Sequence, residues 1–320
     1  MTRVVIIGGS GHIGTYLVPR LVSAGFEVVS VSRGKRAPYQ PNGAWKFVRT
    51  VILSREAEEN AGAFGRKIRE LRPDIVIDMI CFTEASARHL VEALRGQVRH
   101  FLHTGTIWVH GPSVEVPTTE MQPRRPFGEY GIAKAQIEAY LIGVSRKESF
   151  PATIIHPGHI VGPGWAPLNP AGHFNPNVFT MLAKGEELCL PNFGLETVHH
   201  VHADDVAQMF MYAIAHWSAS VGEAFHSVSP AAITLHGYAE AMAACFGREP
   251  KLRYLPWPEW KEGQSELEAE QTYDHIAHTA SPRRKRMLSY RPRYRSIEAV
   301  CESVSWLIHK GIVQVERKAV

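Results

Sequence analysis

The sequence lacks the features that mark several protein classes. It has only four cysteines in 320 residues and no CxxC pair, which argues against a disulfide scaffold or a zinc ribbon. No apolar run approaches the roughly 20 residues that span a bilayer. The first apolar stretch, Val4 to Ile7, runs into glycines and is too short for the core of a signal peptide. We therefore expect a protein of the reducing cytoplasm without membrane association.

A strong excess of charge is also missing. Thirty-five basic and 31 acidic residues give a formal charge of +4, which does not by itself indicate nucleic acid as a partner. The one basic cluster, Arg283 to Arg286 followed by Arg291, Arg293 and Arg295, is expected to be a solvated surface near the C-terminus. Apolar residues make up 45% of the chain, as in ordinary globular proteins, and the length suits a large domain with a smaller lobe.

Strand-like and helix-like segments alternate through the first half of the chain. Strands are predicted at 3–7, 26–31, 74–79, 100–104 and 152–156, and helices at 15–24, 84–94 and 130–142. Pro19 is expected to bend the first helix. Because strands that alternate with helices need crossover connections, the pattern predicts an α/β fold with a doubly wound parallel Rossmann sheet.

The composition changes after about residue 157, where proline, glycine, histidine and tryptophan indicate loops around a cleft. A helix at 203–217 and a strand at 223–228 are predicted beyond it. We assign residues 1–164, with a return segment at about 198–228, to a dinucleotide-binding Rossmann domain. Residues 165–197 and 229–320 are assigned mainly to a smaller C-terminal substrate-binding lobe.

A glycine-rich turn, GGSGHIG at 8–14, follows the first strand and opens the first helix. Glycines at the first, fourth and seventh positions permit a tight turn and a close approach to a pyrophosphate. The N–H groups and dipole at the helix start favour the same anion. A dinucleotide site is therefore predicted, formed by Gly8, Gly11, His12, Ile13 and Gly14.

The end of the second strand bears on the choice of dinucleotide. An acidic residue there would accept hydrogen bonds from the ribose 2′-hydroxyl of NAD, whereas arginine suits the 2′-phosphate of NADP. This chain has Ser32-Arg33-Gly34-Lys35-Arg36 and no acid. NADP(H) is favoured, with Ser32 and Arg33 as binding residues, and NAD(H) stays open because Arg33 could instead stack on adenine or face solvent.

Tyr130 and Lys134 stand four residues apart on one face of a predicted helix. A fixed ammonium nearby would lower the pKa of a phenol, which is roughly 10 when unperturbed, and so fit it for proton transfer. Thr106, just beyond the strand at 100–104, offers a hydroxyl to a substrate oxygen. Tyrosine and lysine at this spacing also occur on helices without a catalytic role, but the order of the motifs along the chain favours one here.

The motifs resemble those of the extended short-chain dehydrogenases/reductases, grouped as NAD-dependent epimerases/dehydratases, over most of the chain. The matching segments are GGSGHIG (TGxxGxxG in the family), HTGTIWVHG at 103–111 (SSxxVYG), Tyr130 with Lys134 (YxxxK), HPGHIVGPG at 156–164 (RPxNVYGPG), VHADDVA at 201–207 (IHVxDVA) and LSYRP at 288–292 (LGxxP). The resemblance implies an oxidoreductase or epimerase that transfers hydride at a secondary alcohol or ketone of a sugar-like substrate, with Tyr130 as acid/base. It also implies a homodimer.

The resemblance extends the predicted site. Catalytic roles fall to Thr106, Tyr130 and Lys134. Cofactor contacts fall also to Tyr130, Lys134, Cys81, His156 and His159. Substrate contacts fall to Thr106, Trp108, His110 and His159. Dehydrogenase and epimerase use the same residues, so the sequence does not separate these reactions.

Departures from the family pattern narrow the choice of reaction and substrate. Sugar-nucleotide 4,6-dehydratases carry an Asp-Glu pair after the catalytic threonine, whereas Ile107 and Trp108 stand here and cannot transfer a proton. Val198 replaces an arginine that commonly contacts the substrate diphosphate, which puts a nucleoside-diphosphate substrate in doubt. The acid expected near adenine after the third strand is replaced by Arg49-Thr50-Val51.

The sequence leaves two alternatives. His199, His200 and His202 with two aspartates could hold a metal, but the family pattern gives His202 and Asp205 a structural role at a helix start, so no metal is predicted and His199 and His200 are expected to line the cleft or face water. A non-catalytic dinucleotide sensor or RNA-binding protein on the same fold is the second function. Only the arginine cluster supports it, and the intact Thr106, Tyr130 and Lys134 oppose it.

Overall fold

Short apolar segments form the centre of a computed structural model that describes residues 1–275 and 288–315. The seven-stranded sheet has the order β11-β6-β5-β4-β1-β2-β3, and every neighbouring pair is parallel. Its strands are β1 (Arg3–Ile7), β2 (Glu27–Ser32), β3 (Arg49–Ile52), β4 (Ile75–Asp78), β5 (His100–Thr104), β6 (Ala152–Pro157) and β11 (Ala224–Ser227). The doubly wound α/β fold is confirmed.

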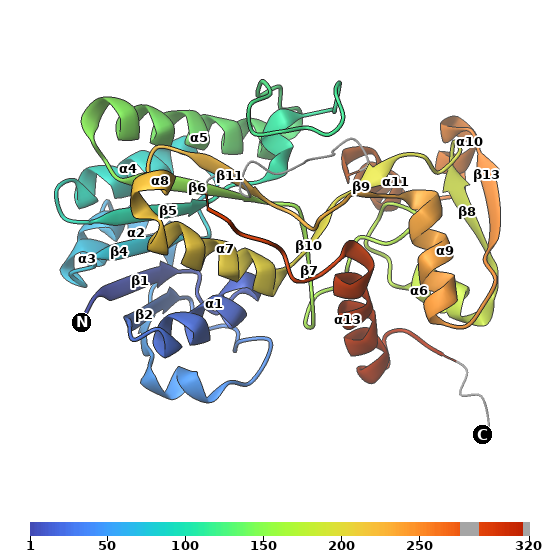
Figure 1. Cartoon of the computed structure of the whole chain (residues 1–320), viewed down its shortest axis with the longest axis horizontal. Helices are drawn as coiled ribbons and strands as arrows, with labels where there is room; N and C mark the ends of the chain where they lie inside the picture. Colours follow the sequence, from blue (N-terminus) through green and yellow to red (C-terminus); the bar gives the residue numbers. More distant parts are fainter. Residues whose placement is uncertain (276–287, 316–320) are drawn as a thin grey trace.

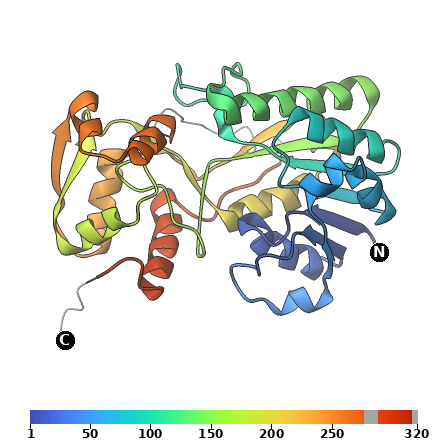
Figure 2. The same cartoon turned by 180° about the vertical axis from the view of Figure 1, so that it is seen from behind.

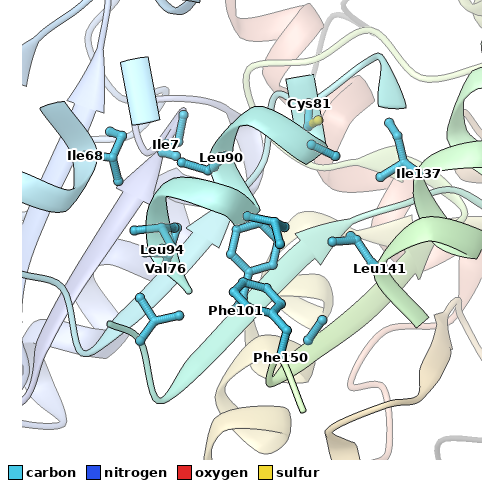
Figure 3. Close-up of a cluster of buried hydrophobic side chains, with 14 of the residues drawn as sticks. Ile7, Ile68, Val76, Cys81, Leu90, Leu94, Phe101, Ile137, Leu141 and Phe150 are labelled. Carbon is cyan, nitrogen blue, oxygen red and sulfur yellow. The ribbon is translucent and has the colours of Figure 1, made fainter. Parts of the chain in front are cut away.

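Helices cover both faces of this sheet (Figure 1). One face packs on α3 (Phe64–Glu70), α4 (Glu84–Leu94) and α5 (Gly128–Glu148), and the other on α1 (His12–Ser23) and α7 (Ala203–Ala215). Figure 3 shows Leu90 and Leu94 of α4 and Leu141 of α5 around Phe101 of β5. Burial of these side chains on both sides of the sheet supplies the main hydrophobic stabilisation.

The helix that carries Tyr130 and Lys134 begins two residues earlier and ends six residues later than predicted. Ser149 follows the helix as its C-cap, and its left-handed φ of 57° closes the last turn. The first helix likewise begins earlier than predicted, at His12, and continues through Pro19 to Ser23. The helix after the glycine turn and the helix that carries Tyr130 are therefore both longer than the apolar pattern predicted.

The strand β3 was not predicted. Its four residues, Arg49–Ile52, lie at the sheet edge and three of them are exposed, so the segment lacks the apolar character that marks a buried strand. Arg49, Thr50 and Val51 therefore lie inside a strand, and the expectation that they replace an acid after the strand is wrong. Leu53, Ser54 and Arg55 follow the strand instead.

A smaller part lies beside the sheet, as both views show (Figures 1 and 2). Its paired strands are β9 (Thr197–Val198) with β12 (Ile233–Thr234) and β8 (Glu187–Pro191) with β13 (Lys251–Leu255). A further parallel pair, β7 (His159–Val161) with β10 (His200–His202), packs Ile160 and Val201 against the core of the main sheet. The helices of the smaller part are α6 (Asn177–Lys184), α9 (Leu235–Cys245), α10 (Trp257–Glu262), α11 (Glu266–His275) and α13 (Ser296–His309). It has a hydrophobic core of its own, which includes Phe179, Tyr238 and Trp260.

Four short helical segments complete the described chain: η1 (Gly43–Phe47), α2 (Arg55–Asn60), η2 (Ile107–His110) and α8 (Trp217–Ser220). In the described residues, no helix combines the length and the apolar character that crossing a membrane requires. The basic run Arg283 to Arg286 lies outside the described residues.

Candidate functional site

The glycine turn is shaped so that no side chain could replace two of its glycines. Gly8 has a φ of +90°, and its N–H donates to Val31 of the adjacent strand. A methyl group on Gly14 would lie 1.9 Å from the carbonyl oxygen of Gly9, so α1 can pack on the turn only through a bare Cα. The turn therefore presents a smooth backbone cradle at the start of a helix, as a pyrophosphate requires.

A cavity of about 830 Å³ opens beside this cradle. Gly8, Ser10 and Gly11 line one part of it, and Ser32, Arg33 and the two basic residues Lys35 and Arg36 line another. This volume and the combination of backbone amides with cationic side chains fit a dinucleotide. The structure thus places predicted residues Gly8, Gly11, Ser32 and Arg33 around one space.

The same cavity contains charged residues that no local sequence pattern indicated. Arg55 is buried and donates from Nη1 to both carboxylate oxygens of Asp78, at 2.7 and 2.9 Å, and from Nε to Glu59 at 2.7 Å. Arg55 and Glu59 both line the cavity. Asp78 lies 23 residues from Arg55 in sequence, so no local spacing indicated the pair. Phe82 and Thr83, also unpredicted, line the side nearest the catalytic candidates.

The three catalytic candidates come together beside this cavity. Lys134 Nζ lies 4.9 Å from the ring centroid of Phe82 and 5.9 Å from that of Tyr130. Thr106 caps η2 by accepting a hydrogen bond from Trp108 N at 3.3 Å, and its side chain forms a hydrogen bond with Tyr130. The strand end and the helix therefore present a hydroxyl, a phenol and an ammonium to one region.

Lys134 is almost completely buried. Its Nζ donates to the carbonyl oxygens of Cys81 at 2.7 Å and Thr104 at 2.9 Å, so the loop after β4 and the end of β5 hold it. Burial lowers the pKa of Lys134 to about 8, since the charged form loses hydration. Cys81 takes part through its backbone; burial raises the pKa of its thiol to about 12, which keeps the thiol neutral.

The pKa of Tyr130 is raised, whereas the sequence predicted that the ammonium of Lys134 would lower it. Tyr130 is 43% exposed, yet burial of the phenol raises its pKa, and the hydrogen bond with Thr106 only partly opposes this. Lys134 directs its hydrogen bonds to backbone carbonyls and does not lower the pKa of the phenol in this structure. The neutral phenol, a proton donor, is therefore the prevailing form near neutral pH.

Aromatic rings and imidazoles line the space next to Tyr130. The Trp108 ring lies 5.6 Å from that of Tyr130 and 4.7 Å from that of His275, centroid to centroid. His159 lies 5.1 Å from His275, and burial lowers the pKa of His275. The predicted residues Trp108 and His159 thus meet Tyr130 and the unpredicted His275 across the two parts of the chain.

Several other predicted residues lie elsewhere. Ile13 packs in the hydrophobic core, and His12 is buried with its ring stacked 5.4 Å from Trp165. His110 is buried, with Nε2 2.9 Å from Nε2 of His226. His156 is fully buried, and its Nδ1 accepts the backbone N–H of Thr106 at 2.9 Å. Its ring therefore contacts the catalytic loop, and it does not line the cavity.

The histidines before α7 have structural partners. His202 caps the helix by accepting Asp204 N at 3.0 Å, and Asp205 accepts the backbone N–H groups of Arg293 and Tyr294. The expectation that His199 and His200 line the cleft or face water is wrong: both are buried, and their Nε2 atoms lie 2.8 and 3.2 Å from the carbonyl oxygens of Ser229 and Leu168. No group of three metal-binding side chains is found over residues 1–275 and 288–315.

Comparison with known proteins gives a consistent result. The sequence profile described as the NAD dependent epimerase/dehydratase family matches residues 4–226. A 2′-dehydrokanamycin reductase of Streptomyces kanamyceticus is 35% identical over 136 residues, which is 42% of this chain and 36% of that protein. The chain thus spans little more than a third of that relative's length.

Two further comparisons extend over nearly the whole chain. A chloroplast stem-loop binding protein of Arabidopsis thaliana is 23% identical over 98% of this chain and 81% of that protein. The crystal structure of a UDP-glucose 4-epimerase from Thermotoga maritima with UDP-glucose superimposes with a TM-score of 0.73, at 20% identity, over 97% of this chain and 99% of that one. At this identity the structural match shows the fold alone.

Proposed function

The chain belongs to the NAD dependent epimerase/dehydratase family, and we propose that it is an NADP(H)-dependent oxidoreductase or epimerase that acts at a secondary alcohol or ketone of a sugar-like substrate. The observation that carries the proposal is the convergence of Thr106, Tyr130 and Lys134 beside the glycine-lined cavity. When bound in that cavity, a nicotinamide dinucleotide supplies or accepts hydride.

The chain's own residues supply the proton transfer. Tyr130, neutral near pH 7, donates the proton of its hydroxyl to a carbonyl oxygen during reduction and becomes a phenolate. In the oxidative direction the phenolate form receives the proton of the alcohol and becomes the neutral phenol again. Thr106 holds the same substrate oxygen by a hydrogen bond. Lys134 donates to the carbonyl oxygens of Cys81 and Thr104 and so fixes the loop after β4 and the end of β5 beside the phenol.

The substrate we propose is a sugar-like ketone or alcohol without a nucleoside diphosphate. Val198, at the place where the family commonly has a diphosphate-binding arginine, is fully buried in the core of the smaller part. Trp108 and His275 present flat rings beside Tyr130, which suit the apolar face of a sugar. The similarity to a protein named a 2′-dehydrokanamycin reductase supports the same class. Because Ile107 and Trp108 cannot transfer protons, we propose no dehydration step.

NADP(H) is the cofactor we propose. Arg33, Lys35 and Arg36 all line the cavity, and no acid stands among Ser32 to Arg36 to repel a 2′-phosphate. NADPH should bind about tenfold or more tightly than NADH, and Arg33→Asp should remove most of that difference by weakening NADPH binding. Titration calorimetry with both cofactors measures the two Kd values. Tighter binding of NADH by the wild-type protein would overturn the assignment.

The function is tested with a panel of keto sugars, free and linked to a nucleoside diphosphate, each mixed with NADPH. We expect oxidation of NADPH with at least one free keto sugar, and Tyr130→Phe should lower kcat by roughly a thousandfold while the Kd of NADPH changes little. Tyr212→Phe, on the outer helix α7, is the matched control. Equal turnover by the wild-type protein and Tyr130→Phe would refute the role of Tyr130.

Binding of RNA remains the second candidate, because the match to the stem-loop binding protein covers 98% of this chain. The converged Thr106, Tyr130 and Lys134 favour the enzyme. Salt-dependent binding of a stem-loop RNA, together with no NADPH oxidation on any member of the panel, would favour this alternative.

A further inference from the structure

A buried carboxylate extends the row formed by Tyr130 and Lys134. Glu138 follows Lys134 by four residues in α5, so the three side chains share one face of the helix. Arg124, on the loop before the helix, donates from Nε to both carboxylate oxygens at 3.1 Å and from Nη2 to Oε1 at 2.5 Å. Burial of Glu138 opposes ionisation, but His156 and Arg124 hold the pKa of its carboxyl well below the usual range. Glu138 is therefore a carboxylate at neutral pH.

The second neighbour of this carboxylate is His156 on β6. His156 Nε2 lies 3.4 Å from Glu138 Oε2, and His156 Nδ1 accepts the backbone N–H of Thr106 at 2.9 Å. A neutral imidazole that accepts a hydrogen bond at Nδ1 carries its proton at Nε2. The proton of His156 therefore faces the carboxylate, and the two contacts require the same tautomer.

The ring also fills space that only glycine leaves open. A methyl group on Gly105 would lie 2.3 Å from His156 Nδ1 and 2.6 Å from Cε1. The imidazole thus packs directly on the backbone that precedes Thr106. Arg124 additionally donates to the carbonyl oxygens of Glu120 and Gln122, at 2.7 and 2.9 Å, so the cation that balances Glu138 is itself fixed.

We propose that Glu138 and His156 are positioning residues for Thr106. The carboxylate selects the tautomer and orientation of the imidazole, and the imidazole fixes the peptide of Thr106 so that its hydroxyl meets Tyr130. The proposal rests on the proposed function for its catalytic consequence, but the tautomer and the Thr106 hydrogen bond are properties of the protein alone.

The first test is spectroscopic and needs no substrate. Nuclear magnetic resonance of protein labelled with nitrogen-15 in the histidine rings should show that His156 is protonated at Nε2 and unprotonated at Nδ1. The signals of His156 are assigned by their loss in His156→Asn. The Thr106 amide should be protected from exchange in the wild-type protein. In His156→Leu this protection should be lost, and in His156→Asn it should be largely kept, because the Asn Oδ1 replaces the Nδ1 acceptor.

The second test measures turnover with NADPH and the keto sugar that the wild-type protein reduces fastest. His156→Leu should lower kcat by roughly a hundredfold, as expected when a catalytic group is misplaced by about 1 Å, with the Kd of NADPH unchanged. His156→Asn and Glu138→Gln, which keep an acceptor, should recover most of the kcat.

The matched control is His100→Leu. His100 is equally buried, at the opposite end of β5 from Thr106, and its Nε2 lies 2.8 Å from Thr153 Oγ1. This variant should lose stability without a comparable loss of kcat. The proposal is overturned if His156 is protonated at Nδ1, if the Thr106 amide is unaffected in His156→Leu, or if His100→Leu lowers kcat as much. If the wild-type protein reduces no keto sugar, the proposed function fails. The spectroscopic test still decides whether Glu138 and His156 position Thr106.

Discussion

At the scale of single residues, Gly14 shows how little space the dinucleotide cradle leaves. A methyl group there would lie 1.9 Å from the carbonyl oxygen of Gly9, a contact that only a shift of the backbone could relieve. Gly143, within α5, has no atom within 4 Å of the corresponding position. The two glycines therefore have different roles, although both lie within helices.

Gly14→Ala should displace the turn and weaken NADPH binding by at least about tenfold, because the backbone amides lose their common orientation. Gly143→Ala should leave binding intact and stabilise the protein by roughly 0.5–1 kcal/mol through helix propensity. Calorimetric titration and urea unfolding measure the two effects. Wild-type affinity in Gly14→Ala would show that the cradle does not hold the cofactor.

The residues of the site differ in how far the sequence could predict them. Tyr130 and Lys134 were found because a fixed spacing on a helix brings side chains together. Glu138 continues that spacing, so the signal existed, but its partners Arg124 and His156 are set by the packing of a loop and a strand. The contact of His275 with Trp108 depends on how the two parts of the chain meet, and no local pattern records it.

At the scale of elements, the start of α7 joins segments that are far apart in sequence. Asp204 accepts hydrogen bonds from Arg20 of α1 and from Arg293, and Asp205 accepts the backbone N–H groups of Arg293 and Tyr294. Tyr290 also donates to the carbonyl oxygen of Asp205 at 2.7 Å. These bonds fix the returning chain between the sheet and α13.

Asp205→Ala should lower the free energy of unfolding by about 3 kcal/mol, since two backbone donors lose a fully buried acceptor. Asp205→Asn keeps one carbonyl oxygen and should lose about half as much. Urea denaturation gives both values. A loss below about 0.5 kcal/mol in the alanine variant would mean that water replaces the carboxylate.

Elements with strong apolar patterns were predicted well. The strand at 100–104 and the helix at 84–94 have the predicted bounds, because a buried strand and an amphipathic helix each leave a regular pattern. The edge strand Arg49–Ile52 has mostly exposed side chains, so its sequence shows no regular apolar pattern. The two added residues at the start of the tyrosine helix and the six at its end, which include Gly128, Gly143 and Arg146, carry no regular apolar pattern.

At the scale of the whole molecule, the protein buries many histidines. Burial lowers the pKa of His12, His100 and His200 from 6.5 to about 4 in the folded state, so the unfolded chain takes up these protons first as the pH falls. The free energy of unfolding is therefore at its full value above about pH 6.5. Each of these groups lowers it by up to about 3 kcal/mol as the pH falls toward 4.

Stability measured by urea unfolding should accordingly fall steeply between about pH 6.5 and 4. His200→Gln should reduce the steepness, because the buried imidazole of His200 is then gone. A stability that stays constant from neutral pH down to about pH 5 would contradict the burial of these imidazoles.

We propose that the phenol of Tyr130 and the glycine-lined cavity form one site of hydride and proton transfer. A single turnover with NADPH deuterated at the transferable position and a keto sugar, followed by mass analysis of the sugar, measures this transfer. We predict that one deuterium moves to the carbonyl carbon in the wild-type protein, and that transfer in Tyr130→Phe is slower by roughly a thousandfold at unchanged cofactor occupancy. Equal rates in the two proteins, or a reduced sugar without deuterium, would contradict the account.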